Sequence, residues 1–513
     1  MAYTFAFCVM AAVSIPSLVA AEPSFDQMYA QPEGYFIRTG YSTMNGAEAR
    51  LSRSQLKEMQ SSLDFIHGLA AKDASFNGSA AYGRLAEAMS ILIKKFIKPI
   101  SVSDWQAMLR EMSSIIGKER PLNDWDTVVD HMLQVAVLHL KDPHTDYMGP
   151  EISAKFWDSI SRGTLSGIGV EASADASGVR LDFVYPGYGA DKAGLKDGDI
   201  VAAIDGKRVA GVPIDKVHLE GEAGTSMSLV VLREGRELDP IEVTRTQIEL
   251  PGILKKMVGP NIGYIYFTLF QTDLDEKIIS AIRQLRDSGA EALIIDVRGN
   301  PGGNNHTVSA VAAEFLSDGD TIAEFRHQEV LDFKYVAQGD GAFFGMPVAV
   351  LIDERSASAS EILAGVLKYR GYPIVGARSY GKGTKQVVYE QSQGRSFKIT
   401  EDLVYIPIPC PGSTGKGAPS CMWNVNARRN PKDGSKIPGT GGIIPDYIVD
   451  VPLELRSQIM KQRLFELLDC PLGTRIADPV VEKAVEVLTQ RMRGGSTPKG
   501  PGVTPGKRRR RPV

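Results

Sequence analysis

The chain has 513 residues, with 43% apolar and 23% charged side chains, which is the composition of a folded globular protein. This length exceeds what one hydrophobic core serves, so we expect roughly two to four domains. The formal net charge of -3 excludes an overall attraction to nucleic acid or to an anionic membrane.

The first residues are expected to be an export signal. Phe5 to Val19 is almost unbroken apolar sequence, and a run of about 15 residues is too short to span a bilayer comfortably. Small side chains up to Ala21 suit a signal peptidase, which predicts residues 1–21 as a signal peptide. Because no Lys or Arg precedes the run, an uncleaved N-terminal anchor is the alternative. We expect export to the periplasm or another extracytoplasmic compartment.

Residues 22–162 are predicted to form a mostly helical N-terminal region. Apolar residues recur at helical spacing from Gly83 to Leu140, which indicates several helices. They should end before Pro143, because proline biases the preceding residue away from helix. Residues 22–82 lack this period and are expected to cover the surface of another part of the protein.

Residues 163–249 are predicted to be β-rich. Asp205-Gly206 is a strong tight-turn signal, and Ala190 to Leu195 could form one short helix. Short β-branched runs predict strands at Gly178–Tyr185, Ile200–Ile204 and Ser228–Arg233.

The motifs of this segment resemble a PDZ domain. The matching residues are Gly167-Ile168-Gly169-Val170, Tyr185-Pro186, Ala193-Gly194-Leu195, Gly198-Asp199 and Gly224-Thr225. The resemblance implies that the backbone of Gly167, Ile168, Gly169 and Val170 binds a peptide carboxylate, because glycines permit the dihedrals that turn N–H groups toward an anion. The peptide would then add as a β-strand. The alternative for these glycines is an ordinary bulge in a β-domain.

Residues 250–452 alternate strands and helices, which indicates an α/β core. Strands are predicted at Ile262–Phe267, Leu293–Val297, Pro347–Ile352 and Pro373–Val375, and helices at Leu274–Asp287 and Ser360–Lys368. Residues 453–513 should hold one or two helices and a disordered basic tail that ends in Lys507–Arg511. Contact of this tail with phosphates or lipid headgroups at a membrane surface is the sharper alternative.

Four cysteines occur in the chain. Cys410 and Cys421 flank a loop rich in Gly, Pro and Ser, and they could close a small ring in an oxidising compartment. Cys8 would leave with the signal, and Cys470 would remain as a small buried hydrophobe. No Cys/His group has zinc-like spacing, so we expect neither a metal site nor a cofactor.

Three segments carry the chemistry. Asp296–Asn304 is rich in glycine and follows a buried strand, and Ser356–Ile362 is followed by Gly381–Gln386. With Asp142–Thr145, Ile262–Ile265 and Gly442–Asp446 they resemble the carboxyl-terminal processing (tail-specific) proteases of the Ser-Lys type. The resemblance covers roughly residues 83 to 452. It implies a serine endopeptidase with a crotonase/Clp-like α/β core that cleaves near protein C-termini.

A lysine is the expected general base. A serine hydroxyl is a poor nucleophile until a base takes its proton, and a lysine can do so only when neutral. Burial can lower its pKa from about 10.4 by several units. Lys382 lies between two glycines with no acid next to it in sequence, and Gln386 could fix its amine by a neutral hydrogen bond.

Alternation does not choose among Ser356, Ser358 and Ser360. The resemblance places the nucleophile at Ser358, just before a helix N-terminus that favours negative charge. It also implies an oxyanion hole made by Gly302, Gly303 and Ala359, for which a plain glycine-rich turn is the alternative. Lys382 follows Ser358 by 24 residues, one fewer than is usual in the family, which indicates a shortened turn around Tyr369 to Pro373.

Three rival interpretations fit parts of the sequence. A Ser-His-Asp triad could use His144 or His306, but no GxSxG elbow is present. Ser54-Gln55-Leu56-Lys57 has the SxxK spelling of penicillin-binding enzymes, without a partner motif. The chain could also be a catalytically inactive, PDZ-containing peptide-binding protein with a protease-like core. The expected partners are protein or peptide substrates with exposed C-termini and no nucleic acid; a homo-oligomer or an adaptor is left open.

Overall fold

The computed structural model describes residues 41–45, 61–62, 64–69, 76, 80–98, 100–119, 124–162, 165–212, 217–248, 252–409, 420–426, 440–469 and 475–494. The expected signal peptide, Ser54–Lys57 and the basic tail lie outside them. The described residues form two compact units: a β-rich unit of Lys155–Leu254 and Asp450–Glu482, and an α/β unit that holds the other described residues. In these ranges no helix is long and apolar enough to cross a membrane, and no His/Cys/Asp/Glu group is arranged to hold a metal ion.

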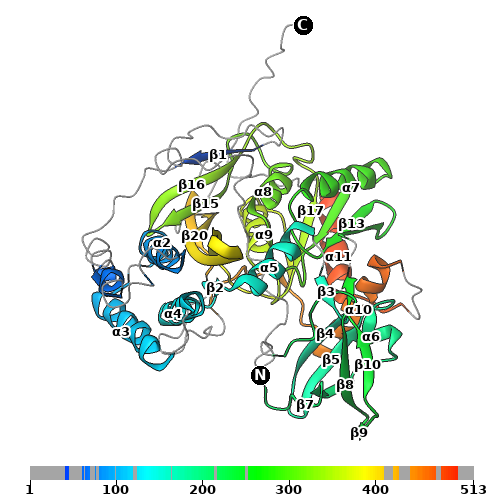
Figure 1. The fold of residues 1–513 in the computed structure, drawn as a ribbon. Coiled ribbons are helices and arrows are strands. Elements are labelled where there is room, and N and C mark those ends of the chain that lie inside the picture. The colour runs from blue at the N-terminus through cyan, green and yellow to red at the C-terminus, as the bar shows by residue number, and fades with distance from the viewer. Residues whose placement is uncertain are drawn as a thin grey trace. The chain divides into compact units, whose positions relative to one another are not determined.

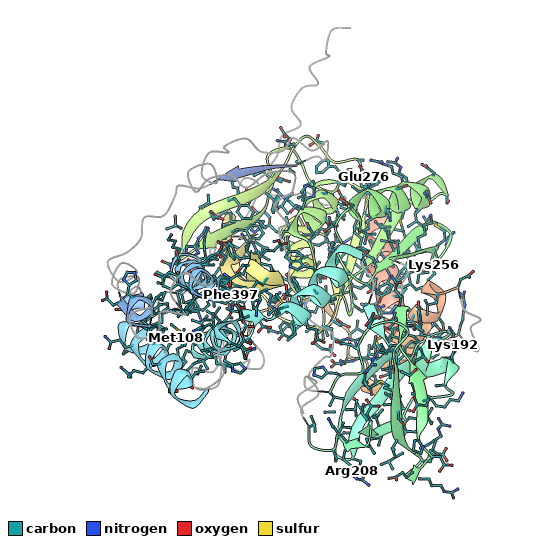
Figure 2. All side chains as sticks on the ribbon, in the orientation of Figure 1. Met108, Lys192, Arg208, Lys256, Glu276 and Phe397 are labelled. Atoms are coloured by element: carbon teal, nitrogen blue, oxygen red, sulfur yellow. The ribbon has the colours of Figure 1, made fainter. Side chains whose placement is uncertain are left out.

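The predicted N-terminal helices are confirmed. They are α2 (Ala80–Lys95), α3 (Val102–Glu119) and α4 (Trp125–His139). Their apolar faces share one core with Phe397 and Ile399 of strand β20 (Arg395–Pro409). Helix α2 lies beside that strand, and α4 lies beside β2 (Asp146–Met148), which pairs with β20 (Figure 1). Met108 on α3 and Phe397 are both labelled in Figure 2. Burial of this shared face joins the helices to the sheet.

The α/β core is built on a six-stranded sheet. Its strands, in spatial order, are β12 (Ile253–Met257), β13 (Ile262–Phe267), β14 (Ala292–Asp296), β17 (Val348–Ile352), β18 (Ile374–Gly376) and β22 (Tyr447–Ile448). Neighbours from β13 to β22 are parallel. The helices of this core are α7 (Asp275–Asp287), α8 (Asn305–Ala313) and α9 (Ala359–Tyr369). Strands β13, β14, β17 and β18 and helices α7 and α9 agree with the prediction to within one residue at each end, whereas β12, β22 and α8 were not predicted. The loops after β13, β14 and β17 leave the same edge of the sheet, where α/β proteins place their sites.

A second, antiparallel sheet was not predicted. Its main path is β1 (Tyr41–Asn45), β16 (Val330–Ala337), β15 (Thr321–His327), β20 and β19 (Thr384–Gln391). Strands β2 (Asp146–Met148) and β21 (Ser420–Asn424) also pair with β20, and η2 (Ser392–Gly394) links β19 to β20. The register of β19 and β20 sets Gln386 opposite Thr400, so this sheet carries part of the site.

The β-rich unit contains the strands predicted for residues 163–249. Its main sheet runs β10 (Ile241–Thr244), β8 (Ser226–Arg233), β6 (Ile200–Ile204), β5 (Gly178–Val184) and β4 (Val170–Asp175), with β7 (Lys207–Arg208) and β9 (Arg236–Glu237) at its side. A separate pair is formed by β3 (Leu165–Gly167) and β11 (Thr246–Ile248). Asp205 and Gly206 both have positive φ, at 46° and 75°, which confirms the tight turn. The predicted helix at Ala190–Leu195 is shorter, α6 (Gly189–Lys192), because Gly194 adopts a φ of 80° and ends it.

In the described part of the chain after residue 452 there are two helices, as predicted: α10 (Leu453–Leu467) and α11 (Pro479–Arg493). Within the β-rich unit, α10 packs on β5, where Phe465 meets Phe183 edge to face at 6.1 Å. Lys461 Nζ lies 2.6 Å from the Asp197 carboxylate of the same unit. A further helix, α5 (Pro150–Arg162), precedes β3.

Candidate active site

The glycine-rich loop after β14 and the serine loop after β17 are bonded to each other. Gly299 N–H donates to Asp353 Oδ1 at 2.9 Å, and Ala357 N–H donates to the Asn300 carbonyl at 3.1 Å. Asn300 is fully buried, and its Nδ2 donates to the Phe267 carbonyl at the end of β13. Three strand ends are thereby fixed together at one edge of the sheet.

A buried ion pair supports the base of the glycine-rich loop. Asp296 is fully buried, and it accepts from Arg298 Nη2 at 2.6 Å and from the Tyr264 hydroxyl at 2.7 Å. The paired guanidinium and the hydroxyl compensate the cost of burying the carboxylate. The chain therefore leaves β14 along a fixed path.

The three serines differ in their surroundings. Ser356 Oγ donates to the Val297 carbonyl at 2.7 Å, and Ser360 Oγ donates to the Asn300 carbonyl at 2.9 Å. Both flanking hydroxyls therefore join the two loops. Ser358 directly precedes α9, as the sequence predicted, and has φ 54° and ψ -115°. A non-glycine residue with positive φ is strained, and such strain clusters at functional sites.

Gly302 lies against Ser358. A Cβ on Gly302 would come 2.7 Å from Ser358 Cβ and 2.9 Å from the Ala359 nitrogen, so only glycine fits. Gly302 N–H already donates to Asn300 Oδ1 at 2.9 Å. Within the described chain, Gly303 N–H and Ala359 N–H have no acceptor of their own. Of the three residues assigned to the oxyanion hole, these two keep available donors.

The loop that carries Lys382 is held to the serine loop through Glu361. This fully buried carboxylate accepts from Ser358 N–H at 2.9 Å, Lys382 N–H at 2.8 Å, Gly381 N–H at 2.7 Å and the Ser379 hydroxyl at 2.5 Å. Burial raises the pKa of Glu361, while these four donors oppose the rise. One carboxylate thus fixes the backbones of the predicted nucleophile and the predicted base.

Lys382 is buried, with 6% of its surface exposed, and it forms no ion pair with a described residue. Burial lowers the pKa of Lys382 to about 7, and repulsion from Lys398 adds to this. The carboxylates of Asp142 and Glu361 act in the opposite direction. A neutral amine is therefore accessible near physiological pH, as general-base chemistry requires.

Gln386 lies on β19 and is fully buried. Its Nε2 donates to Thr384 Oγ1 at 3.0 Å and to Thr400 Oγ1 at 3.2 Å, whereas its Oε1 accepts no hydrogen bond in the described residues. Thr400 Oγ1 donates in turn to Asp142 Oδ2 at 2.5 Å. The sequence predicts that Gln386 Oε1 accepts a hydrogen bond from the Lys382 amine. No other described group occupies this oxygen, and the bond to the amine stays a prediction.

The predicted carboxylate loop lies in the β-rich unit, between β3 and β4. Gly169 has φ 80°, and a Cβ there would meet Tyr188 Cβ at 2.4 Å. The Ile168 and Gly169 carbonyls accept from Ala190 N–H at 2.6 Å and from Tyr185 N–H at 2.9 Å, whereas the N–H groups of Ile168 and Gly169 donate to no described residue. Val170 begins β4, the edge strand of the main sheet among the described strands.

The remaining predicted residues are placed as follows. Cys421 is disulfide-bonded, but Cys410 lies outside the described residues, so the pairing stays a prediction. His144 lies before β2 and His306 in the first turn of α8, and no hydrogen bond joins either ring to Ser358 where the structure describes the chain.

Sequence reasoning assigned no role to Glu361, Lys398 or Asp142. For Glu361 a signal was available, because Ser358 and Glu361 have the spacing of a capping box. Lys398 and Asp142 carry no such local signal. Their place at the site depends on the strand register.

Part of the sequence is similar to known peptidases. The sequence model of Peptidase family S41 matches residues 261–409. The carboxy-terminal processing protease CtpB of Bacillus subtilis (strain 168) is 32% identical over 287 residues, which is 54% of this chain and 59% of CtpB. CtpA of the same strain is 29% identical over 280 residues, covering 54% of this chain and 60% of CtpA. The chain thus spans less than two thirds of either relative.

A solved structure shares the fold. The photosystem II D1 C-terminal processing protease superposes with a TM-score of 0.51 at 23% identity, over 74% of this chain and 96% of that protein. The predicted mixed α/β architecture is confirmed at the level of the overall fold. The chain therefore carries a peptidase family S41 domain and is homologous to the carboxy-terminal processing proteases.

Proposed function

We propose that this protein is a serine endopeptidase in which Ser358 is the nucleophile and Lys382 the general base. The observation that carries the proposal is the joining of two loops by Glu361, which holds a strained serine and a buried lysine in one site. A lysine buried without an ion pair is costly to the fold, and such a cost is typical of functional sites.

The chemistry follows from these groups. Neutral Lys382 takes the Ser358 proton as Oγ attacks the peptide carbonyl, and the amides of Gly303 and Ala359 stabilise the oxyanion. The protonated lysine gives its proton to the leaving amine, which leaves an acyl-serine. Water, deprotonated by the same lysine, then releases the product acid and restores the serine. No metal or cofactor takes part in this proposal.

Direct cleavage tests the proposal. The purified protein should cut an unstructured polypeptide that ends in apolar residues, with products mapped by mass spectrometry. A reagent specific for activated serines should label Ser358. An inactive peptide-binding protein, the alternative drawn from the sequence, would neither cut the polypeptide nor react with the reagent.

The pH dependence of cleavage should report the charge state of Lys382. With the pKa of Lys382 near 7, kcat/KM should rise from acid pH, reach half its maximum close to pH 7 and level off above it, because only the neutral amine accepts the serine proton. Rates measured from pH 5 to 10 with a substrate that has no titrating group will show this limb. A bell centred near pH 5 would indicate carboxylate chemistry instead.

We further propose that the β-rich unit holds a PDZ-like module that recruits substrate tails. The donor groups of the loop at Ile168 and Gly169, next to the edge strand β4, suit a terminal carboxylate followed by an added strand. The proposed substrates are proteins with exposed C-termini, met after export to an extracytoplasmic compartment. Binding the tail raises the local concentration of the cleavable segment.

Deletion of residues 165–247 should separate two proposed effects of the module. One is tethering of the substrate tail; the other is gating, in which tail binding raises the activity of the Ser358–Lys382 dyad. Thr145 and Gly263, which flank the module, belong to the same α/β unit, so the module interrupts that unit in sequence. We expect cleavage of a tailed protein to fall by about 100-fold, through lost tethering, and cleavage of a short untailed peptide to fall by less, through lost gating. The two rates are compared with those of the intact chain. Unchanged rates on both substrates would contradict recruitment and gating alike.

A further inference from the structure

Lys398 is a second lysine on the face of β20 that belongs to the site. Side chains alternate along a strand, and Phe397 and Ile399 enter the core formed with the N-terminal helices. Lys398 and Thr400 therefore share the opposite face. Thr400 bonds to Gln386 and Asp142 there, so Lys398 projects from the face that those residues line.

Lys398 is buried and has no counter-ion within bonding distance among the residues that the structure describes. Its exposed fraction is 7%, and no described carboxylate forms an ion pair with it. Asp146, its partner in the β2–β20 register, is exposed and does not bond to it, and its β19 partner is the uncharged Val388. A buried lysine is almost always paired, so one that is unpaired requires an explanation.

Charged side chains on three parts of the fold act on the pKa of Lys382. Lys398 acts from β20, Asp142 from the loop before β2 and Glu361 from α9. The two carboxylates favour the ammonium form of Lys382, which cannot act as a base. Lys398 is the opposing charge, and like charges in a low-dielectric site disfavour ionisation of the second group.

We propose that Lys398 acts through Lys382, as a fixed cation that offsets Asp142 and Glu361 and keeps the Lys382 amine in its proton-accepting form near neutral pH. Lys398 itself exchanges no proton with substrate. This inference rests on the proposed function, because it assigns Lys382 the part of general base. The site would then use two lysines, a neutral one that reacts and a charged one that sets the charge state of the first.

The test compares Lys398→Met, Lys398→Arg and the surface control Lys277→Met. Methionine keeps most of the length of the side chain without its charge, so the acid limb of kcat/KM should move up by roughly one pH unit. The rate should then be about fivefold lower at pH 7 and recover above pH 9. Arginine retains the charge and should retain the midpoint. Lys277 is exposed on α7, and its loss should leave the profile unchanged.

A second readout does not depend on activity. Trace acetylation of Lys382 across the pH range, quantified by mass spectrometry, follows the charge state of its amine, and its midpoint should shift with Lys398→Met. A midpoint that stays in place in a folded Lys398→Met protein would overturn the inference, and so would a loss of rate that is equal at every pH. If the wild type does not cleave at all but the labelling midpoint still moves, the proposed function fails and the electrostatic role stands.

Discussion

Replacing Ser358 or Lys382 should abolish peptide cleavage. Ser358→Ala removes the attacking oxygen, and Lys382→Met removes the base that takes its proton, so each should lower kcat/KM by at least about 1000-fold. The measurement is initial cleavage of the polypeptide substrate. Circular dichroism and thermal melts should show that both variants keep the fold.

The neighbouring serines supply matched controls. Ser356→Ala and Ser360→Ala each remove one hydrogen bond to a carbonyl that keeps a backbone donor, Asn300 N–H at Val297 and Ala357 N–H at Asn300. Each should cost about 0.5 to 1.5 kcal/mol of stability, with activity largely retained. Full activity in Ser358→Ala together with loss in Ser360→Ala would overturn the choice of nucleophile.

Lys382→Met should also stabilise the protein at neutral pH. The pKa of Lys382 is about 7 in the folded chain and about 10.4 in the unfolded one, so the unfolded state binds more protons between these values. Stability then rises with pH across this window, and the charged lysine costs roughly 4 to 5 kcal/mol below it. Removing the amine should abolish this slope. A higher melting temperature combined with lost activity would distinguish a functional lysine from a structural one.

The parallel sheet could be predicted from sequence because its signals are local. The strand at Ile262–Phe267 is a continuous apolar run between turns, and α7 has one apolar face. The antiparallel sheet was missed because β20 mixes buried polar residues such as Lys398 and Thr400 with the apolar ones. Polar residues on a buried face conceal the alternation on which a strand prediction depends.

The same distinction applies to the site. Ser358 and Lys382 could be found because a motif surrounds each of them. Asp142 and Lys398 could not, because each reaches the site only through the pairing of β2 and β19 with β20; Asp142 bonds to Thr400, which is 258 residues away in sequence. Glu361 lies between these two cases, because it has both a local sequence signal and contacts that only the fold creates. Its capping-box spacing relates it to Ser358, but its bonds to Gly381 and Lys382 require the tertiary fold.

Glu361→Gln should weaken both the fold and the reaction. The carboxylate accepts four hydrogen bonds, and an amide places an NH₂ group against at least one of those donors, Gly381 N–H. Leaving a buried donor unsatisfied costs about 1 to 3 kcal/mol, seen as a lower melting temperature. The loops of Ser358 and Lys382 would also lose their common anchor. A displacement of about 1 Å between nucleophile and base can cost roughly 100-fold in rate.

The two effects of Glu361→Gln can be separated by measurement. Cleavage should be followed well below the melting temperature of the variant, with the labelling rate of Ser358 by a serine reagent as a second readout of the site. Glu276→Gln on α7, an exposed position labelled in Figure 2, makes the same chemical change away from the site and should alter neither quantity. If Glu361→Gln melts lower but cleaves and labels at the wild-type rate, the carboxylate stabilises the core without positioning the dyad. Wild-type melting with a large loss of rate would instead assign Glu361 to the reaction alone, and the anchoring argument would be wrong.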